Sequence, residues 1–256
     1  MIGALAVPAL AAANSGGGSA LAPASSPSGS RSATTRATAN SMRSSETSSA
    51  AQNGNLAVSS TGDGITLVTH ASTMLRNQLT FTGTAPSGQA GRTVEIERLG
   101  HQTNWKWAAT VPATIGSDGS FSATWHTNHI GRFSIRARIV QAPTSSSSAA
   151  ALPAVTVTVY RQSIATEYGE GFWGQKTACG QTLRRSTIGV ANRTLKCGTK
   201  VALYYHGRTM IVPVIDRGPY ANHADWDLTE ATDKAMGIDG TATIGAVSLP
   251  AQPARS

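Results

Sequence analysis

The chain is poor in the residue types that build metal sites, membrane spans and large aromatic cores. Of its 256 residues only 5% are aromatic and 13% charged, and there are two cysteines. Two cysteines outside a CxxC pair cannot supply a four-ligand zinc site. No apolar run is long enough to cross a bilayer, which takes about 20 residues. We therefore expect no metal, no cofactor and no integral membrane span.

Acidic residues are scarce as well. The sequence has 13 Asp and Glu against 21 Lys and Arg, which gives a formal net charge of +8. The basic residues are mostly single arginines, apart from short groups at Arg31–Arg36 and Arg184–Arg185. A nucleic-acid footprint needs denser clusters, so no nucleic-acid partner is expected. Dispersed positive charge fits either weak attraction to an acidic cell-wall polymer or a contribution to solubility.

Large apolar residues are almost missing from residues 15–60, where Ser, Ala, Gly and Thr dominate. Such a composition cannot offset its conformational entropy by burial, so this segment is predicted to be a disordered linker. Residues 1–14 are apolar and end in small residues, with an Ala-x-Ala-like region at Ala11–Ala13. They are similar to the second half of a secretory signal, although its charged beginning is missing. Export to the cell wall or the medium is expected.

Residues 61–160 alternate apolar and polar side chains in short segments. This period of two indicates strands buried on one face, and seven such strands favour an immunoglobulin-like β-sandwich. Asp118–Gly119 predicts a hairpin between two of the strands. Trp105 and Trp107 would share one strand face, and a Ser/Ala-rich loop is expected at 145–150. The predicted strands are Ile65–Val68, Gln78–Thr82, Thr93–Glu97, Trp105–Ala108, Ser120–Trp125, Phe133–Arg138 and Val155–Val159.

Residues 161–250 form the second predicted domain, a small closed β-barrel entered through a linker at Arg161–Ser163. One helix is expected from Asp227 or Thr229 to Met236, with Thr229 as N-cap and Gly237 closing it. A tight turn at 206–208 would join two of the strands. The predicted strands are Ile164–Tyr168, Lys200–Tyr205, Thr209–Ile215 and Thr243–Leu249.

Two aspartates in this second domain are the candidate catalytic residues. Asp216 follows an apolar run in Val214–Tyr220 (VIDRGPY) and leads into a Gly-Pro turn, and Asp227 opens the DLT of WDLT, eleven positions later. A carboxyl group at the edge of an apolar core has a raised pKa and is suited to donate a proton. The alternative is that Asp216 is a turn former whose side chain caps local N–H groups.

The two cysteines, Cys179 and Cys197, are each followed by glycine. In an exported protein they are expected to pair, which would close a loop of about nineteen residues and contribute about 3 kcal/mol to stability. Two unrelated buried thiols are the alternative.

The second domain resembles the rare lipoprotein A-like double-psi β-barrel family. The resemblance lies in the runs ATEYGEGFWGQKTACG, GVANRTLKCGT, VIDRGPY and WDLT, in that order. It implies a six-stranded barrel, a disulfide between Cys179 and Cys197, and catalytic roles for Asp216 as the acid and Asp227 as its partner. Many members are lytic transglycosylases of peptidoglycan, and expansins share the barrel. Residues 61–160 resemble the bacterial immunoglobulin-like modules that accompany secreted wall enzymes.

The resemblance also has two departures. Members that cleave glycan carry Glu where this chain has Gln181, and His where it has Asn192. Neither amide titrates, so both can bind a sugar hydroxyl but cannot transfer a proton. The residues expected to contact substrate are Tyr168, Gln181, Asn192, Arg217, Tyr220 and Trp226.

These expectations leave three functional hypotheses. The first is an exported, monomeric lytic transglycosylase that cleaves peptidoglycan glycan strands between MurNAc and GlcNAc and leaves 1,6-anhydro ends. The second is a non-catalytic, expansin-like glycan-binding or wall-loosening module. The third is a secreted inhibitor that borrows the barrel. His223, Asp225 and Asp227 at alternate positions also allow a metal site, which we rank below these because no further His or Cys is near.

Overall fold

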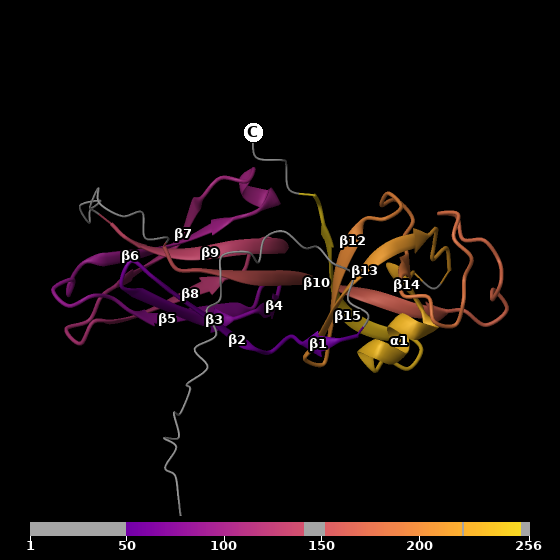
Figure 1. Ribbon diagram of the computed structural model, residues 1–256, viewed down its shortest axis with the longest axis horizontal. Coiled ribbons are helices and arrows are strands. Elements are labelled where there is room, and N and C mark those ends of the chain that lie inside the picture. Colours follow the sequence, from indigo (N-terminus) through magenta and orange to yellow (C-terminus); the bar gives the residue numbers. More distant parts are fainter. Residues whose placement is uncertain (1–49, 141–151, 222, 252–256) are drawn as a thin grey trace, which may run out of the picture. The chain divides into compact units, whose positions relative to one another are not determined.

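The computed structural model describes residues 50–140, 152–221 and 223–251, and strands predominate in these ranges (Figure 1). They form a β-sandwich followed along the chain by a closed β-barrel, so the mainly-β fold expected from the sequence is confirmed. The signal-like segment at 1–14 and the loop at 145–150 lie outside the described residues.

The sandwich consists of two sheets. One has the strand order β2-β3-β5-β8, and the other contains β10-β9-β6-β7, with β4 pairing with β10. Its strands are β2 (Ala57–Gly62), β3 (Ile65–His70), β4 (Ser72–Met74), β5 (Gln78–Thr84), β6 (Thr93–Leu99), β7 (Ala108–Thr114), β8 (Ser120–His126), β9 (Gly131–Ile139) and the first part of β10 (Ala154–Tyr168).

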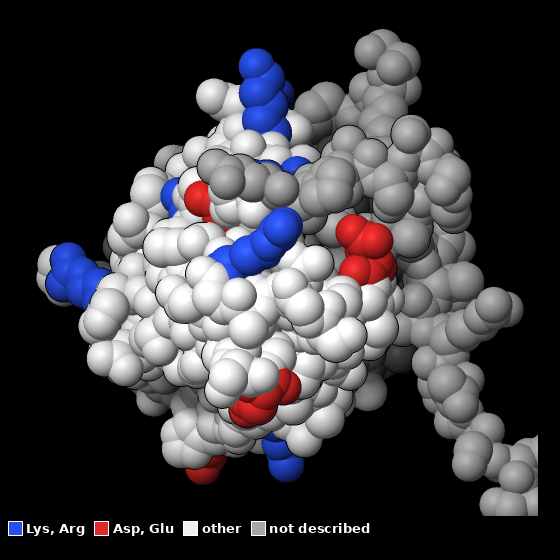
Figure 2. Space-filling model, turned by 90° about the vertical axis from the view of Figure 1, so that its left-hand side faces the viewer, with Lys and Arg blue, Asp and Glu red and all other residues white. Residues whose placement is uncertain are grey.

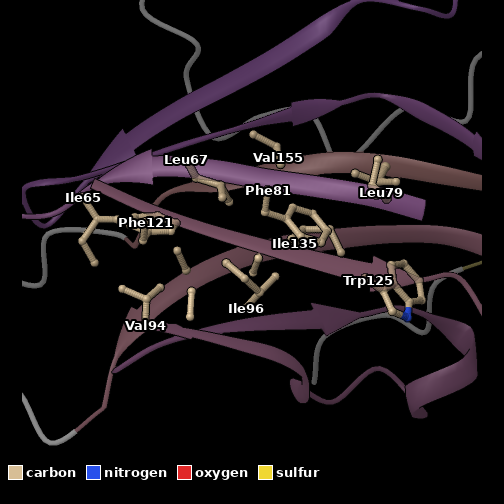
Figure 3. Packing of buried hydrophobic residues seen from close by; sticks show 14 of the residues in the cluster. Ile65, Leu67, Leu79, Phe81, Val94, Ile96, Phe121, Trp125, Ile135 and Val155 are labelled. Carbon is tan, nitrogen blue, oxygen red and sulfur yellow. The ribbon is translucent and has the colours of Figure 1, made fainter. Parts of the chain in front are cut away.

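Alternating burial builds the core between the two sheets. In β8, Phe121, Ala123 and Trp125 are buried while their neighbours face solvent, which is the pattern that identified the strand in the sequence. Figure 3 shows Phe121 and Trp125 in one cluster with Ile96 and Ile135 of the facing sheet. The more specific assignment as an immunoglobulin-like module stays a prediction.

Two local predictions in the sandwich were wrong. Asp118–Gly119 is a turn but not a hairpin, because β7 pairs with β6 whereas β8 pairs with β5 in the other sheet. The Asp118 side chain accepts hydrogen bonds from Ser120 and so shapes a crossing between sheets. Trp105 and Trp107 do not share a strand face, since they follow the short 3-10 helix η1 (His101–Thr103) and precede β7.

β10 (Ala154–Tyr168) runs without a break from the sandwich into the barrel. Its first part pairs with β9, and the part from Arg161 onward pairs with β15 (Ala242–Leu249). The predicted linker at Arg161–Ser163 is therefore wrong, because these residues are in the middle of one strand. Three consecutive polar residues resemble a linker in sequence. In the structure they lie just after the point where the partner of β10 changes from β9 to β15.

Six strands close the barrel. The order is β14-β11-β13-β12-β15-β10, and parallel pairing between β10 and β14 completes the ring. The strands after β10 are β11 (Val190–Ala191), β12 (Lys200–Tyr205), β13 (Arg208–Asp216), β14 (Trp226–Thr229) and β15. Buried side chains from all of these strands form one core inside the ring. The structure thus confirms the closed six-stranded barrel.

The helix α1 (Glu230–Met236) follows β14 directly. Thr229 is its N-cap, because the hydroxyl accepts the N–H of Thr232, and Gly237 ends it in a left-handed conformation with φ 70°. Both caps match the prediction. Asp227 lies on β14 and not on the helix. Of the two predicted beginnings of the helix, Asp227 and Thr229, the second is therefore correct.

The predicted linker at 15–60 ends too late. The short strand β1 (Gln52–Asn53) lies within it and β2 begins in it, and β1 pairs with the beginning of β13 in the barrel. Tyr204 donates its hydroxyl proton to Asn55 Oδ1 next to this pair. Backbone pairing orders this polar segment although it has few large side chains to bury. Residues 15–49 lie outside the described residues.

In the described ranges, no helix combines the length and apolar character needed to cross a membrane. On the face in Figure 2, charged side chains of both signs are separated by uncharged surface. This agrees with the scattered distribution of arginine along the sequence.

Candidate functional site

The barrel places Asp216 and Asp227 on either side of one small residue. Asp216 is the last residue of β13 and Asp227 the second residue of β14, and both pair with Ala191 of β11. On its other side Asp227 pairs with Thr166 of β10. Because strands are spaced at about 4.8 Å, the two aspartate Cα atoms are about 10 Å apart. Ala191 leaves the space between the two carboxyl groups free of a large side chain.

Backbone N–H groups hold the carboxyl group of Asp216. The N–H groups of Ala178 and Arg217 both donate to its Oδ1, each over 2.8 Å. Ala178 is 38 residues away in sequence and belongs to the loop after β10. The Asp216 side chain thus accepts one local hydrogen bond, from Arg217, and one from a distant loop. It is therefore more than a local cap of the Gly-Pro turn, because it connects two loops.

Asp227 has a different environment. The Thr166 hydroxyl donates to its Oδ1 over 2.8 Å. Burial raises the pKa of Asp227, the hydrogen bond from Thr166 opposes that rise, and the negative charges of Asp216 and Glu167 add to it. Asp227 therefore keeps a proton to a higher pH than an ordinary aspartate does.

Tyr168 lies two residues after Thr166, on the same face of β10. Its hydroxyl is buried and has no hydrogen-bond partner among the described residues. Burial, and then the charges of Asp216 and Asp227, raise the pKa of Tyr168, so the phenol stays protonated and can only donate to a carboxylate. The ring of Phe172 meets that of Tyr168 edge-on at 6.4 Å, and Phe172 itself is 53% exposed.

A disulfide joins the two loops that border Asp216. Cys179 and Cys197 are bonded, with their Cα atoms 5.6 Å apart, which confirms the predicted pairing. Cys179 follows Ala178, whose N–H donates to Asp216, and Arg217 Nη2 donates to Cys197 Sγ over 3.4 Å. The covalent bond thus fixes the position of a donor to the candidate catalytic carboxyl group.

Arg217 does not form an ion pair with the neighbouring carboxyl group of Asp216. Its guanidinium donates to the backbone oxygens of Asn192 and Asp216, and none of the ion pairs of the described residues involves it. It therefore organises the loop around the site.

Asn192 is likewise engaged within the protein. Its Oδ1 accepts the N–H groups of Thr194 and Leu195, and its Nδ2 donates to the backbone oxygen of Asp225. The side chain that stands in place of a histidine thus orders the loop after β11. A sugar would have to compete with these three hydrogen bonds.

Trp226 lies in the barrel core and is 5% exposed. This placement contradicts the expectation that Trp226 contacts a glycan, because its ring is covered by other core side chains. Tyr220, in contrast, is 79% exposed, and Gln181 is exposed too. Trp173 covers Gly169, where an added Cβ would lie 2.1 Å from the indole ring, so it supports the turn after β10.

Asp225, which the metal alternative used, supports the backbone. Its Oδ2 accepts the N–H of Ile164, and its Oδ1 is 3.8 Å from Arg161. In the part of the chain that the structure describes, no group of three or more His, Cys, Asp and Glu residues is arranged to hold a metal ion.

Three contributors to the site escaped sequence reasoning: Thr166, the N–H of Ala178, and Ala191. Thr166 could have been suspected from its place two residues before Tyr168 in the motif run, since it shares that face of the strand. The other two depend on strand order and loop closure, which leave no local signal.

The barrel, with its two aspartates, is the part of the chain that is similar to known proteins. Residues 161–249 match the model of the lytic transglycolase family. A probable endolytic peptidoglycan transglycosylase RlpA from Synechocystis is 34% identical over 98 residues, which cover 38% of this chain and 30% of the relative. The endolytic peptidoglycan transglycosylase RlpA of Campylobacter jejuni is 38% identical over 85 residues, 32% of this chain and 31% of the relative.

The chain thus spans less than a third of the length of these two relatives. Among solved structures, Streptomyces papain inhibitor is 24% identical and aligns over 35% of this chain and 93% of its own. The TM-score of this alignment is 0.29.

Proposed function

We propose that this chain is an exported cell-wall protein whose barrel cleaves peptidoglycan glycan strands as a lytic transglycosylase. The observation that carries the proposal is the placement of Asp216 and Asp227 on either side of Ala191, in a barrel that matches the model of the lytic transglycolase family. The products would be glycan fragments with 1,6-anhydro ends. We further propose that the chain acts as a monomer and does not bind nucleic acid.

The reaction requires one proton donor and one negative charge. A carboxyl group protonates the oxygen between MurNAc and GlcNAc, the bond from C1 of MurNAc to that oxygen breaks, and positive charge develops at C1. The 6-hydroxyl of the same MurNAc then bonds to C1 and gives its proton back to the carboxylate. Because this attack is intramolecular, it needs no activated water. A second carboxylate stabilises the positive charge.

Exposed aromatic and polar side chains near the aspartates would hold the glycan. Phe172, next to Tyr168, and Tyr220, four residues after Asp216, offer ring faces on which a pyranose can stack. Gln181 is free to approach a sugar hydroxyl because its side chain is exposed. Arg217 and Asn192 would act through the loop conformation that they stabilise.

The second candidate function is glycan binding without cleavage. Gln181 and Asn192 favour it, since neither side chain can titrate and the Asn192 amide is already engaged within its loop. In this case the two aspartates would bind sugar hydroxyls without transferring a proton.

Export is proposed from two features. The signal-like segment at 1–14 fits it, and the disulfide suits an oxidising compartment outside the cytoplasm. In the wall, the formal charge of +8 would favour residence among acidic polymers.

Product analysis distinguishes the two functions. Purified protein is incubated with intact peptidoglycan and with glycan strands freed of stem peptides, and the soluble products are examined by mass spectrometry. Anhydro-muropeptides or anhydro-glycans, absent with Asp216→Asn/Asp227→Asn, are expected for the enzyme. Binding to sedimented peptidoglycan without any such product would reject the enzyme and support the second candidate.

A further inference from the structure

Resting on the proposed function, we propose that Asp227 donates the proton to the glycosidic oxygen, while Asp216 is the fixed carboxylate that faces the positive charge. The motif pattern alone favours the opposite assignment, with Asp216 as the acid. Two features decide between them: the hydrogen-bond donors that each carboxyl group receives, and the charges around Asp227.

Asp216 is arranged as an acceptor. Two backbone N–H groups, from Ala178 and Arg217, converge on its Oδ1. An oxygen that already accepts two N–H groups is suited to carry negative charge, since such donors bind the charged form of a carboxyl group. The disulfide at Cys179 and the turn into Arg217 fix these donors, so the negative charge has a defined position.

Asp227 is arranged to hold a proton. Its side chain is half-buried, and its Oδ1 accepts one hydroxyl, that of Thr166. The groups that face it are Asp216 from β13, Glu167 and Tyr168 from β10, and the uncharged Ala191 from β11. Burial and the two acidic neighbours raise the pKa of Asp227, and the Thr166 hydrogen bond reduces that rise. When two carboxyl groups have different environments, the one that keeps its proton is the acid.

Tyr168 completes the arrangement. Its protonated hydroxyl is buried without a partner among the described residues, and both carboxylates act on it electrostatically. When Asp227 gives up its proton, this hydroxyl can donate to the new carboxylate and so stabilise it. Tyr168 is thus a positioning residue that acts through Asp227.

Leaving-group dependence tests the assignment. Asp216→Asn and Asp227→Asn form a matched pair, because an asparagine oxygen can still accept the hydrogen bonds at either position. Each variant is assayed on peptide-free glycan strands and on an aryl MurNAc glycoside with a 4-nitrophenol leaving group, which departs without protonation. Asp63→Asn, on the sandwich, serves as the control substitution.

For Asp227→Asn we expect a loss of about 100-fold or more on glycan strands, with the aryl substrate cleaved within about 10-fold of the wild-type rate. For Asp216→Asn we expect comparable losses on both substrates. If Asp216→Asn is the variant that keeps aryl cleavage while Asp227→Asn loses it, the assignment is wrong.

A second measurement does not depend on turnover. The carboxyl carbon of Asp227 is titrated by NMR in the wild-type protein and in Asp216→Asn. We expect a midpoint above that of an ordinary aspartate, and a lower midpoint in Asp216→Asn because a neighbouring negative charge is removed. An ordinary or lower midpoint in the wild-type protein overturns the inference. Absence of product with both substrates, together with a raised midpoint, rejects the proposed reaction and leaves the proton on Asp227.

Discussion

Asp233 is a buried carboxyl group on α1, outside the candidate site. Burial, and then the negative charge of Glu167, raise its pKa from 3.8 to about 7, although the N–H of Gly240 opposes the rise. The folded state therefore holds this proton at pH values where the unfolded chain has lost it. The resulting stabilisation is complete below pH 3.8 and is lost as the pH rises toward about 7.

The side chain of Asp233 also hydrogen-bonds Glu167. Asp233→Asn should remove the dependence of stability on pH, because an amide does not titrate and can donate that hydrogen bond at every pH. We expect the variant to be more stable than wild type at pH 8, by a few kcal/mol at most, and to lose less stability between pH 4 and 7. Urea unfolding at several pH values measures both effects. Asp63→Asn, a substitution in an exposed turn of the sandwich, is the control. A slope in Asp233→Asn equal to that of wild type contradicts the prediction.

Removing the hydroxyl of Tyr168 should affect stability and activity in different ways. A buried hydroxyl without a partner costs about 1–3 kcal/mol, so Tyr168→Phe should leave the melting temperature unchanged or raise it. The same substitution should lower product release, because it removes the donor beside the two aspartates. Thermal unfolding and product analysis on one preparation test both parts. A clear drop in melting temperature would mean that the hydroxyl has a structural partner, and Tyr220→Phe, with its ring exposed, is the stability control.

For single residues, the sequence predicted the two candidate catalytic aspartates but not the placement of the side chains around them. Asp216 stands out because it ends an apolar run, and Asp227 because it opens the DLT of WDLT eleven positions later. The sequence could not show that Trp226 faces the barrel core or that the Asn192 amide is engaged in its own loop. Both outcomes depend on which way a strand or loop residue points after the ring has closed.

The loop between β10 and β11 is held by its disulfide and by few large side chains. Removing the bond with Cys179→Ser/Cys197→Ser should cost about 2–4 kcal/mol of stability. It should also release the Ala178 N–H from Asp216, so glycan cleavage should fall even at temperatures where the barrel stays folded. Chemical unfolding gives the first quantity and anhydro-product yield at low temperature the second. Loss of stability with full activity would show that Ala178 keeps its place without the disulfide.

Strands with a clear alternation were predicted well, and short or shared strands were not. β5, β6, β8 and β9 each alternate over several residues and were found. The two-residue strand β11 carries no pattern, although Ala191 is the residue between the aspartates. Alternation does not show whether two consecutive strands pair with each other, so the sequence predicts a hairpin at Asp118–Gly119 where the chain instead crosses between sheets.

The sandwich and the barrel are joined both by backbone pairing and by a small apolar cluster. β10 belongs to both, and β1 adds a second backbone connection by pairing with β13. A separate apolar cluster lies around Tyr160, where Val247 and Leu249 of the barrel are buried. Gly245 allows the close approach, because an added Cβ would lie 2.9 Å from both Met74 Sδ and Tyr160 Cβ. None of this was visible in the sequence, where the polar residues after Tyr160 resemble a flexible linker.

This shared cluster predicts that the described chain unfolds in one cooperative step. Tyr160 is 3% exposed, and its ring lies 5.4 Å from that of Tyr204. Tyr160→Ala should remove about 3–5 kcal/mol of packing, as other large-to-small core changes do. Because the sandwich and the barrel each keep a core of their own, the single transition should then divide into two.

Differential scanning calorimetry measures this through the ratio of the van't Hoff to the calorimetric enthalpy. The ratio should be near one for the wild-type protein and clearly lower for Tyr160→Ala. Tyr220→Ala, which removes a ring that is 79% exposed, should leave both the ratio and the melting temperature unchanged. Two transitions in the wild-type protein would mean that the sandwich and the barrel unfold independently. The barrel would then need neither β1 nor the Tyr160 cluster to hold Asp216 and Asp227 in place.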